Sequence, residues 1–219
     1  MGTQYSRCVS NVKPSPRARA ARTRRAILDA SHAEFIERGY HGATIASIAK
    51  RAGVASQTVY FVFHTKTDLV SAVIDDRVLG PDAPEDPESS SWWQAMAGAP
   101  TARGVLEAFI RGAAPILDRA APLSEVVRAA AASDDEVRAI HEHHDLLQRA
   151  GYRRVVELAA SRGALGRGLA IDTATDVLLT LCGDGVWVQL TADRRWTADQ
   201  VVDWLVTAVP ASLLALDSD

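Results

Sequence analysis

The chain has 219 residues, of which 47% are hydrophobic and 23% are charged, as in an ordinary globular protein. No apolar run approaches the roughly 18 residues of a membrane span, and two cysteines are too few for a disulfide framework, which argues against membrane and disulfide-rich secreted proteins. Residues 1–80 carry 12 Lys/Arg against 6 Asp/Glu, a net of +6, whereas residues 81–219 carry 12 against 21, a net of −9. A basic head on an acidic body in a reducing cytoplasm is therefore expected, with a polyanion as one candidate partner.

A flexible basic arm is predicted for residues 1–18, which contain two prolines and no apolar periodicity. If the head binds DNA, this arm lies along phosphates or in a minor groove; otherwise it is a solvated tail. A helix is predicted from Arg19 to Arg38, with Ile27, Ser31 and Phe35 on its inner face and Gly39 ending it.

The segment from Thr44 to Lys66 predicts two short helices joined by a tight turn. Ile45, Ile48 and Ala49 have the spacing of one buried helical face, with Thr44 as the N-cap. Gly53 can adopt the positive φ that the turn requires. Residues 44–63 are therefore interpreted as a DNA-reading helix-turn-helix.

The rest of the chain is predicted to be helical almost throughout. Thr65 is placed to cap a helix that ends near Leu79, and prolines and serines between residues 81 and 91 indicate a loop. Further helices are predicted at Thr101–Ala120, Pro122–Ala132, Ser133–Ser161, Asp172 or Thr173 to Leu190, and Thr197–Leu214. Pro115 and Pro210 are expected to kink or break them locally. The predicted fold class is all-α.

Residues 22–81 resemble the DNA-binding domain of the tetracycline-repressor (TetR) family. The matching positions are Arg25-x-Ile27-Leu28, Phe35, Gly39-Tyr40, Thr44-Ile45-x-x-Ile48-Ala49, Ala52-Gly53-Val54, Thr58-Val59-Tyr60, Phe63, Lys66 and Leu69. The resemblance implies a three-helix head at residues 19–81 and a helical ligand-binding and dimerisation bundle at residues 82–219.

Eight residues of the head are candidates for contact with double-stranded DNA: Thr44, Ser56, Gln57, Thr58, Tyr60, Phe61, His64 and Lys66. Tyr60 and Lys66 suit phosphates, by resemblance and because a phenol and an ammonium bind anions, while Gln57 can read adenine. Two roles are open for Phe61, packing in the core and contact with a thymine methyl, whereas Phe63 is assigned to the core. Ala55 and Gln57 depart from the family's frequent Ser and Gly, so either Ser56 caps the reading helix or the helix starts at a different residue.

A single head contacts few phosphates, so a symmetric homodimer on a palindromic operator is expected. By resemblance, the last two helices form the dimer, and the candidate interface residues are Leu178, Leu179, Val186, Leu190, Val202, Trp204 and Leu205.

The resemblance also implies a pocket for a small-molecule effector in the C-terminal half. Its candidate residues are Trp93, Phe109, His141, His144, Asp184 and Trp187. His144 is favoured as a hydrogen-bonded core histidine over a ligand contact, and Asp184 as a dimer contact over a ligand contact. His141 and His144 lack a well-spaced fourth ligand group, so no metal and no cofactor are expected.

The leading functional hypothesis is a repressor that a small molecule releases from its operator. The alternatives are an activator on the same scaffold, a helical interaction module without a small ligand, and a metal-assisted hydrolase with a DNA-binding head. No Ser-His-Asp signature, phosphate loop or HExxH sequence supports an enzyme.

Overall fold

The computed structural model describes residues 15–80, 90–166 and 168–215, and these are helical with no β-strand beyond one isolated bridge between Leu165 and Leu214. The elements in chain order are α1 (Pro16–Gly42), α2 (Ile45–Ala52), α3 (Ser56–Phe63), α4 (Lys66–Leu79), α5 (Ser91–Ala97), α6 (Ala102–Ala131), α7 (Asp135–Arg162), α8 (Ile171–Leu181), α9 (Asp184–Val188), the π-helical η2 (Gln189–Asp193) and α10 (Ala198–Leu213). The predicted all-α class is confirmed.

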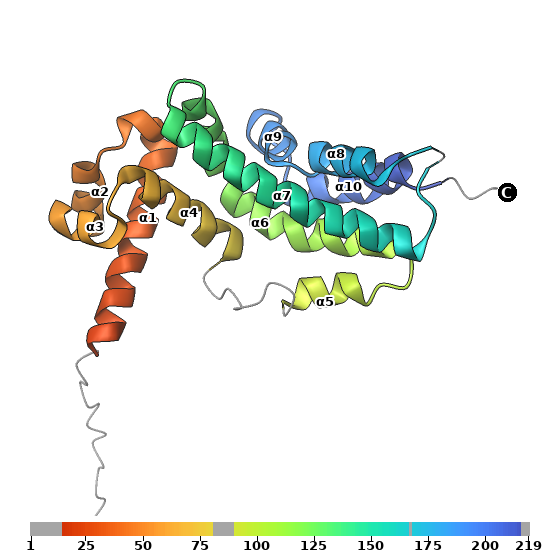
Figure 1. Ribbon diagram of the computed structural model, residues 1–219, viewed down its shortest axis with the longest axis horizontal. Helices are drawn as coiled ribbons and strands as arrows, with labels where there is room; N and C mark the ends of the chain where they lie inside the picture. Colours follow the sequence, from red (N-terminus) through yellow and green to blue (C-terminus); the bar gives the residue numbers. More distant parts are fainter. Residues whose placement is uncertain (1–14, 81–89, 167, 216–219) are drawn as a thin grey trace, which may run out of the picture.

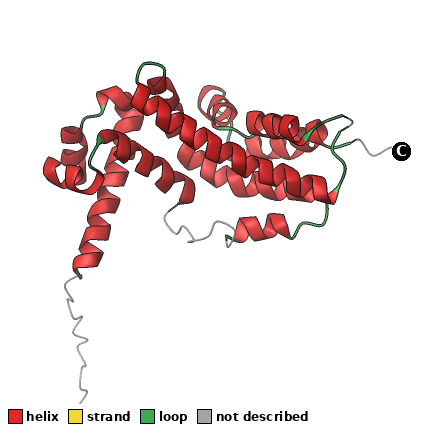
Figure 2. Cartoon of the chain, in the orientation of Figure 1, coloured by secondary structure: helices red, strands yellow, loops and turns green. Residues whose placement is uncertain are grey.

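The elements form a head and a longer body (Figures 1 and 2). In the head, α1 to α3 pack beside the start of α4. In the body, α6 and α7 lie side by side along its length, with α5 against α6 and with α8, α9 and α10 grouped together. The last described residues lie at the end of the body that is remote from the head.

The head shares its hydrophobic core with the body. The buried residues of α1 to α4, such as Phe35, Ile48 and Leu69, form one cluster with the C-terminal half of α6. That half contributes Leu123, Val127, Ala130 and Ala131, and α7 adds Val137. The orientation of the head therefore depends on apolar contacts with α6.

Local helix signals are confirmed at several ends. Thr44, Thr65 and Thr197 each accept a hydrogen bond from a backbone N–H of the helix that follows. Gly39 has φ of 68° inside the α1 segment, and Gly53 has φ of 70° after α2. Glycine adopts this left-handed conformation without the steric cost of a Cβ.

Two helix ends differ from the predictions. α1 begins at Pro16 rather than Arg19, because Ser15 accepts from the Ala18 N–H and proline suits a first helical turn. Residues 1–14 of the predicted arm and the loop at residues 81–89 lie outside the described residues. α7 is capped by Asp134 rather than Ser133, since its carboxylate accepts from the N–H groups of Glu136 and Val137.

The predicted division of α6 into two helices is wrong. One helix runs through both Pro115 and Pro122. A proline removes one backbone hydrogen bond and crowds the preceding turn. The buried face nevertheless continues across both prolines, through Ala114, Leu117 and Leu123, so packing against the neighbouring helices outweighs the local loss.

The predicted single helix ending at Leu190 is also wrong. The chain breaks between α8 and α9 at Cys182 and Gly183. A Cβ on Gly183 would overlap the carbonyl oxygen of Leu179, so this close approach requires glycine. The buried carbonyl of Cys182 accepts a hydrogen bond of 2.6 Å from the Tyr152 hydroxyl, which stabilises the break.

The contribution of α6 to the head can be tested with a matched pair of leucines. Leu123 is fully buried, so Leu123→Ala leaves a cavity and is expected to lower the free energy of unfolding by about 2–5 kcal/mol, measured by urea denaturation. Leu146 on α7 is 66% exposed, and Leu146→Ala is expected to change it by less than about 0.5 kcal/mol. Equal losses in the two variants would contradict the shared core.

Candidate nucleic-acid interface and ligand cavity

The helix-turn-helix is held by local hydrogen bonds and a buried face. Thr44 and Ser47 form a reciprocal capping box, with side chain to backbone distances of 3.0 and 3.1 Å. After Gly53, the Val54 N–H donates to the Ala49 carbonyl at 3.0 Å and closes the turn. Ile48 on α2 and Val59 on α3 are buried together in the head core. These contacts fix the angle at which α3 leaves the turn.

One face of α3 is open to solvent. Gln57, Tyr60 and Phe61 are exposed, and Phe61 has 84% of its surface accessible. The other face buries Val59 and Phe63, as predicted for Phe63. An exposed aromatic ring beside an amide and a phenol provides apolar and hydrogen-bonding groups of the kinds that contact base edges and phosphates.

The N-terminus of α3 has no side-chain cap. Ala55 occupies the N-cap position without a side-chain hydrogen bond, and Ser56 is the first helical residue rather than the cap. Ser56 and Thr58 are half-buried beside it. The first backbone N–H groups of the helix therefore lack a side-chain acceptor and suit a phosphate oxygen.

Two further candidates lie where α3 meets α4. His64 has φ of 54° and turns the chain between the helices, and its side chain is exposed. The Lys66 ammonium lies 4.2 Å from the centre of the Tyr40 ring, a cation–π contact. Burial lowers the pKa of Lys66, and the Asp134 carboxylate opposes this effect. Lys66 is thus held at the head surface by Tyr40.

Ion pairs join α1 to α4 behind the reading helix. Arg25 bonds Asp76 at 2.8 Å, and Arg77 bonds Asp29 at 2.6 Å. From the body, the Arg119 guanidinium donates to the Arg77 carbonyl at 3.3 Å. The C-terminal half of α4 is therefore tied to both the head and α6.

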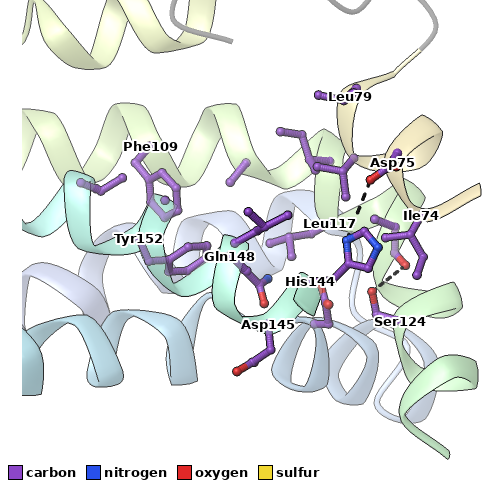
Figure 3. A pocket seen from close by; sticks show the side chains of 18 of the residues that line it. Ile74, Asp75, Leu79, Phe109, Leu117, Ser124, His144, Asp145, Gln148 and Tyr152 are labelled. Atoms are coloured by element: carbon purple, nitrogen blue, oxygen red, sulfur yellow. Dashed lines mark hydrogen bonds and ion pairs between the residues drawn. The ribbon is translucent and has the colours of Figure 1, made fainter. Parts of the chain in front are cut away.

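A cavity of about 380 Å³ lies between α4, α6 and α7, in the size range of small-molecule sites (Figure 3). Its walls are mostly apolar, and α4 contributes Ile74, Asp75, Val78 and Leu79 to them. Phe109 and Tyr152 meet edge to face with ring centres 5.0 Å apart. α5 adds Trp92 and Trp93, and α9 adds Asp184.

His144 links this cavity to α4 (Figure 3). Its Nε2 lies 3.3 Å from the Ser71 hydroxyl, and its Nδ1 lies 3.9 Å from the Asp75 carboxylate. Burial lowers the pKa of His144, as do His143 and His141, while Asp75 raises it. The side chain is therefore a hydrogen-bonded histidine, favoured in its neutral form, that also lines the cavity.

Asp184 places a carboxyl group in the cavity wall at the start of α9. Burial raises the pKa of this group above its ordinary value, and a hydrogen bond from Ser124 opposes the shift. Glu125 raises the pKa further, and His141 lowers it. Asp184 thus faces the cavity and α6, and its favoured role as a dimer contact stays a prediction.

Five of the six candidate ligand residues line this one cavity: Trp93, Phe109, His141, His144 and Asp184. Trp187 does not, because it is 2% exposed and packs in the body core. The sequence reasoning missed Asp75, Gln148 and Tyr152. The two on α7 share the helical face of His144 at spacings of four and eight residues, a signal that was available.

Three candidate dimer residues are corrected by burial. Leu178, Val202 and Leu205 are 0%, 8% and 2% exposed within one protomer, so they belong to its core and leave no surface for a partner. Leu179, Val186 and Leu190 are half-buried, and Trp204 is 37% exposed in an edge-to-face pair with Trp196. The apolar residues of one helix divide between the protomer core and the surface, and their spacing in the sequence does not show which residues belong to which.

Within residues 15–80, 90–166 and 168–215, no three His, Cys, Asp or Glu side chains converge as a metal site would require. In the same part of the chain, no helix is long and apolar enough to cross a membrane.

Residues 27–73 match the family described as bacterial regulatory proteins, tetR family. The HTH-type transcriptional repressor BepR of Brucella suis biovar 1 is 43% identical over 58 residues, which are 26% of this chain and 28% of that protein. The chain thus matches less than a third of this relative's length.

Solved structures with the same fold span nearly the whole chain. FadR of Bacillus subtilis, in complex with stearoyl-CoA, has a TM-score of 0.68 at 18% identity and covers 86% of this chain and 98% of its own. A transcriptional regulator of Saccharomonospora viridis, in complex with choline, has a TM-score of 0.68 at 18% identity and covers 90% of this chain and 100% of its own. The head of the chain is thus similar in sequence to the tetR family of bacterial regulatory proteins, and the whole chain shares the fold of these solved structures.

Proposed function

We propose that this protein is a homodimeric transcriptional repressor that leaves a palindromic DNA operator when a small molecule occupies the cavity between α4, α6 and α7. Its work on DNA places it in the cytoplasm, with residues 19–81 acting as the reading head and residues 82–219 as the sensor and dimerisation body. No enzymatic step is part of this proposal.

The observation that carries the proposal is the position of α4. This helix begins at Lys66, three residues after α3 ends at Phe63, and its second half forms a wall of the cavity. A ligand that displaces this wall changes the position of the reading helix. The ligand needs only to bind the DNA-released arrangement more tightly than the DNA-bound one.

The polar contacts of α4 suggest how the cavity is sensed. His144 lines the cavity and meets Ser71 on α4, and Arg119 of α6 holds the Arg77 carbonyl near the end of the same helix. A molecule that contacts His144 or pushes on Val78 competes with these bonds. Partly buried hydrogen bonds of this kind contribute about 0.5–1.5 kcal/mol each, enough to bias a two-state equilibrium.

Dimerisation is supported by the surface of the segment from α8 to α10. Leu179 on α8, Val186 on α9 and Leu190 on η2 retain accessible apolar surface, and Trp196, just before α10, pairs with Trp204 on α10. Tryptophan is enriched in the cores of protein interfaces. A second copy packed against this surface places two heads for half-sites about one helical turn apart.

Relatives of the same fold support a small-molecule effector. The Bacillus subtilis and Saccharomonospora viridis proteins are in complex with stearoyl-CoA and choline, so this helical architecture accommodates ligands of very different chemistry. The Brucella relative, similar in the head, is named as a repressor, which favours repression over activation.

The DNA contacts are tested by changing single groups on the head. Tyr60→Phe is expected to weaken binding to every duplex about equally, by about 0.5–1.5 kcal/mol, because a phosphate contact carries no sequence information. Lys66→Ala is expected to reduce the slope of log affinity against log salt concentration by about 0.9.

Gln57→Ala is expected to alter preference among duplexes that differ at one base pair, by about 1–3 kcal/mol, because its amide reads a base edge. Operators selected from random duplexes and fluorescence anisotropy provide the measurements for all three variants. If Gln57→Ala lowers the affinity for all duplexes equally, Gln57 does not read a base.

The dimer surface is tested by placing a charge on it. Trp204→Glu is expected to shift the protein to a monomer at micromolar concentration in sedimentation experiments and to weaken operator binding, since a charge is costly in a closed apolar contact. Ile36→Glu in the head is the control, because Ile36 is 40% exposed, close to the 37% of Trp204. A dimer that persists in Trp204→Glu would place the interface elsewhere.

Repression is tested with a reporter gene behind the selected operator. Expression of the protein is expected to lower reporter output, and the double variant Gln57→Ala/Tyr60→Phe is expected to restore it, because its head no longer holds the site. A rise in reporter output with the unaltered protein would identify an activator. No change despite tight DNA binding in solution would contradict both regulatory roles.

A further inference from the structure

The formal charges around the cavity are unequal. Asp75, Asp145 and Asp184 contribute three carboxyl groups to its lining, and Arg154 contributes the cation among the described lining residues. His144 does not restore the balance, because burial lowers its pKa and favours the neutral ring.

The acidic and basic groups occupy different ends of the cavity. Asp75 lies against His144, and Asp184 faces Ser124 and His141. Arg154 lies 13 residues beyond His141 on α7, which separates the two positions by roughly 20 Å along the helix axis. Its guanidinium carbon is 5.4 Å from the centre of the Trp93 ring on α5.

Between these ends the wall is apolar and aromatic. Figure 3 shows Phe109 and Tyr152 on one side of the view and His144, Asp75 and Ser124 on the other, with Leu117 between them. The Tyr152 hydroxyl already donates to the Cys182 carbonyl, so this residue presents its ring to the space rather than a free polar group. The middle of the cavity therefore suits a hydrocarbon or aromatic body.

Electrostatics favour a positively charged ligand beside the Asp184 carboxyl group. Removing a carboxylate from water is costly, and Asp184 is half-buried in the cavity wall. Ser124 and His141 oppose this cost only in part, since the net shift of the Asp184 pKa remains upward. A ligand cation near this group stabilises its ionised form. A ligand carboxylate at the same end would instead be repelled by Asp75 and Asp184.

We propose that the effector is an organic cation with an apolar body, a protonated amine or quaternary ammonium whose charged end lies beside Asp184 and Asp75 and whose body lies along Phe109 and Tyr152. This inference rests on the proposed function, because it assigns a ligand class to the same cavity. Attraction of the cation to the carboxylates supplies selectivity, and contact with the aromatic rings adds to affinity.

Three compounds with one body and different end groups test the ligand class: 4-phenylbutylamine, 4-phenylbutanol and 4-phenylbutanoate. Calorimetry on the full chain at neutral pH is expected to show the amine binding at least about tenfold more tightly than the alcohol, and the carboxylate binding weakest. Equal or tighter binding of the alcohol or carboxylate, or no binding of the amine, overturns the inference.

A pair of isosteric variants locates the charged end. Asp184→Asn keeps the shape and its contact with Ser124 but removes the charge, so the preference for amine over alcohol is expected to fall at least about fivefold. Glu142→Gln is the control, because Glu142 is an exposed residue on α7 that does not line the cavity, and it is expected to keep the preference. Circular dichroism and melting temperature confirm that both variants fold. An unchanged preference in folded Asp184→Asn overturns the assignment.

Release of DNA separates this inference from the proposed function. Addition of the amine to the protein bound to its selected operator is expected to lower the DNA affinity measured by anisotropy. If the amine binds with the expected selectivity and DNA affinity is unchanged, the ligand class stands and ligand-controlled release fails. If the alcohol binds best and releases DNA, release stands and the cationic class fails.

Discussion

The structure depends on one helix belonging to two environments. Leu69, Val70 and Val73 of α4 are buried in the core of the head, whereas Val78 and Leu79, on the next turns, line the cavity of the body. Ile74 belongs to both. Because an α-helix is rigid over a few turns, a displacement at its C-terminal half is carried to the residues that pack under α2 and α3. Neither the head nor the cavity is complete without α4.

The apolar contact of the head with α6 and the polar contacts of α4 have different consequences. Burial of Leu123 and Val127 against the head stabilises the joint without specifying one exact arrangement. The bonds of Arg25 with Asp76, Arg77 with Asp29 and Arg119 with the Arg77 carbonyl are directional and select one arrangement. A joint that is mainly apolar and positioned by a few partly exposed polar bonds can shift without unfolding.

The polar side chains inside the body lie at two kinds of position: where a helix is interrupted, and in the wall of the cavity. Tyr152 closes the break between α8 and α9 by bonding the Cys182 carbonyl, and this break brings Asp184 to the cavity wall. His144 is satisfied by Ser71. Asp184 is the half-buried carboxyl group of this mostly apolar cavity wall, and a counter-charge beside it acts in a medium of lower dielectric than water.

The sequence by itself determined the elements whose signals are local. Threonine caps at positions 44, 65 and 197, the left-handed turn at Gly53 and the spacing of Ile45, Ile48 and Ala49 predicted the head correctly, because these effects act within one or two helical turns. The sequence predicted candidate cavity residues on α5, α6, α7 and α9, but it contains no signal that five of them line the same cavity. Only the tertiary structure decided that α6 runs through Pro115 and Pro122, that the chain breaks at Gly183, and that Leu178 and Leu205 face inward while Trp204 faces outward. Apolar periodicity identifies a face but not the helix that covers it, and that choice depends on contacts between residues far apart in the chain.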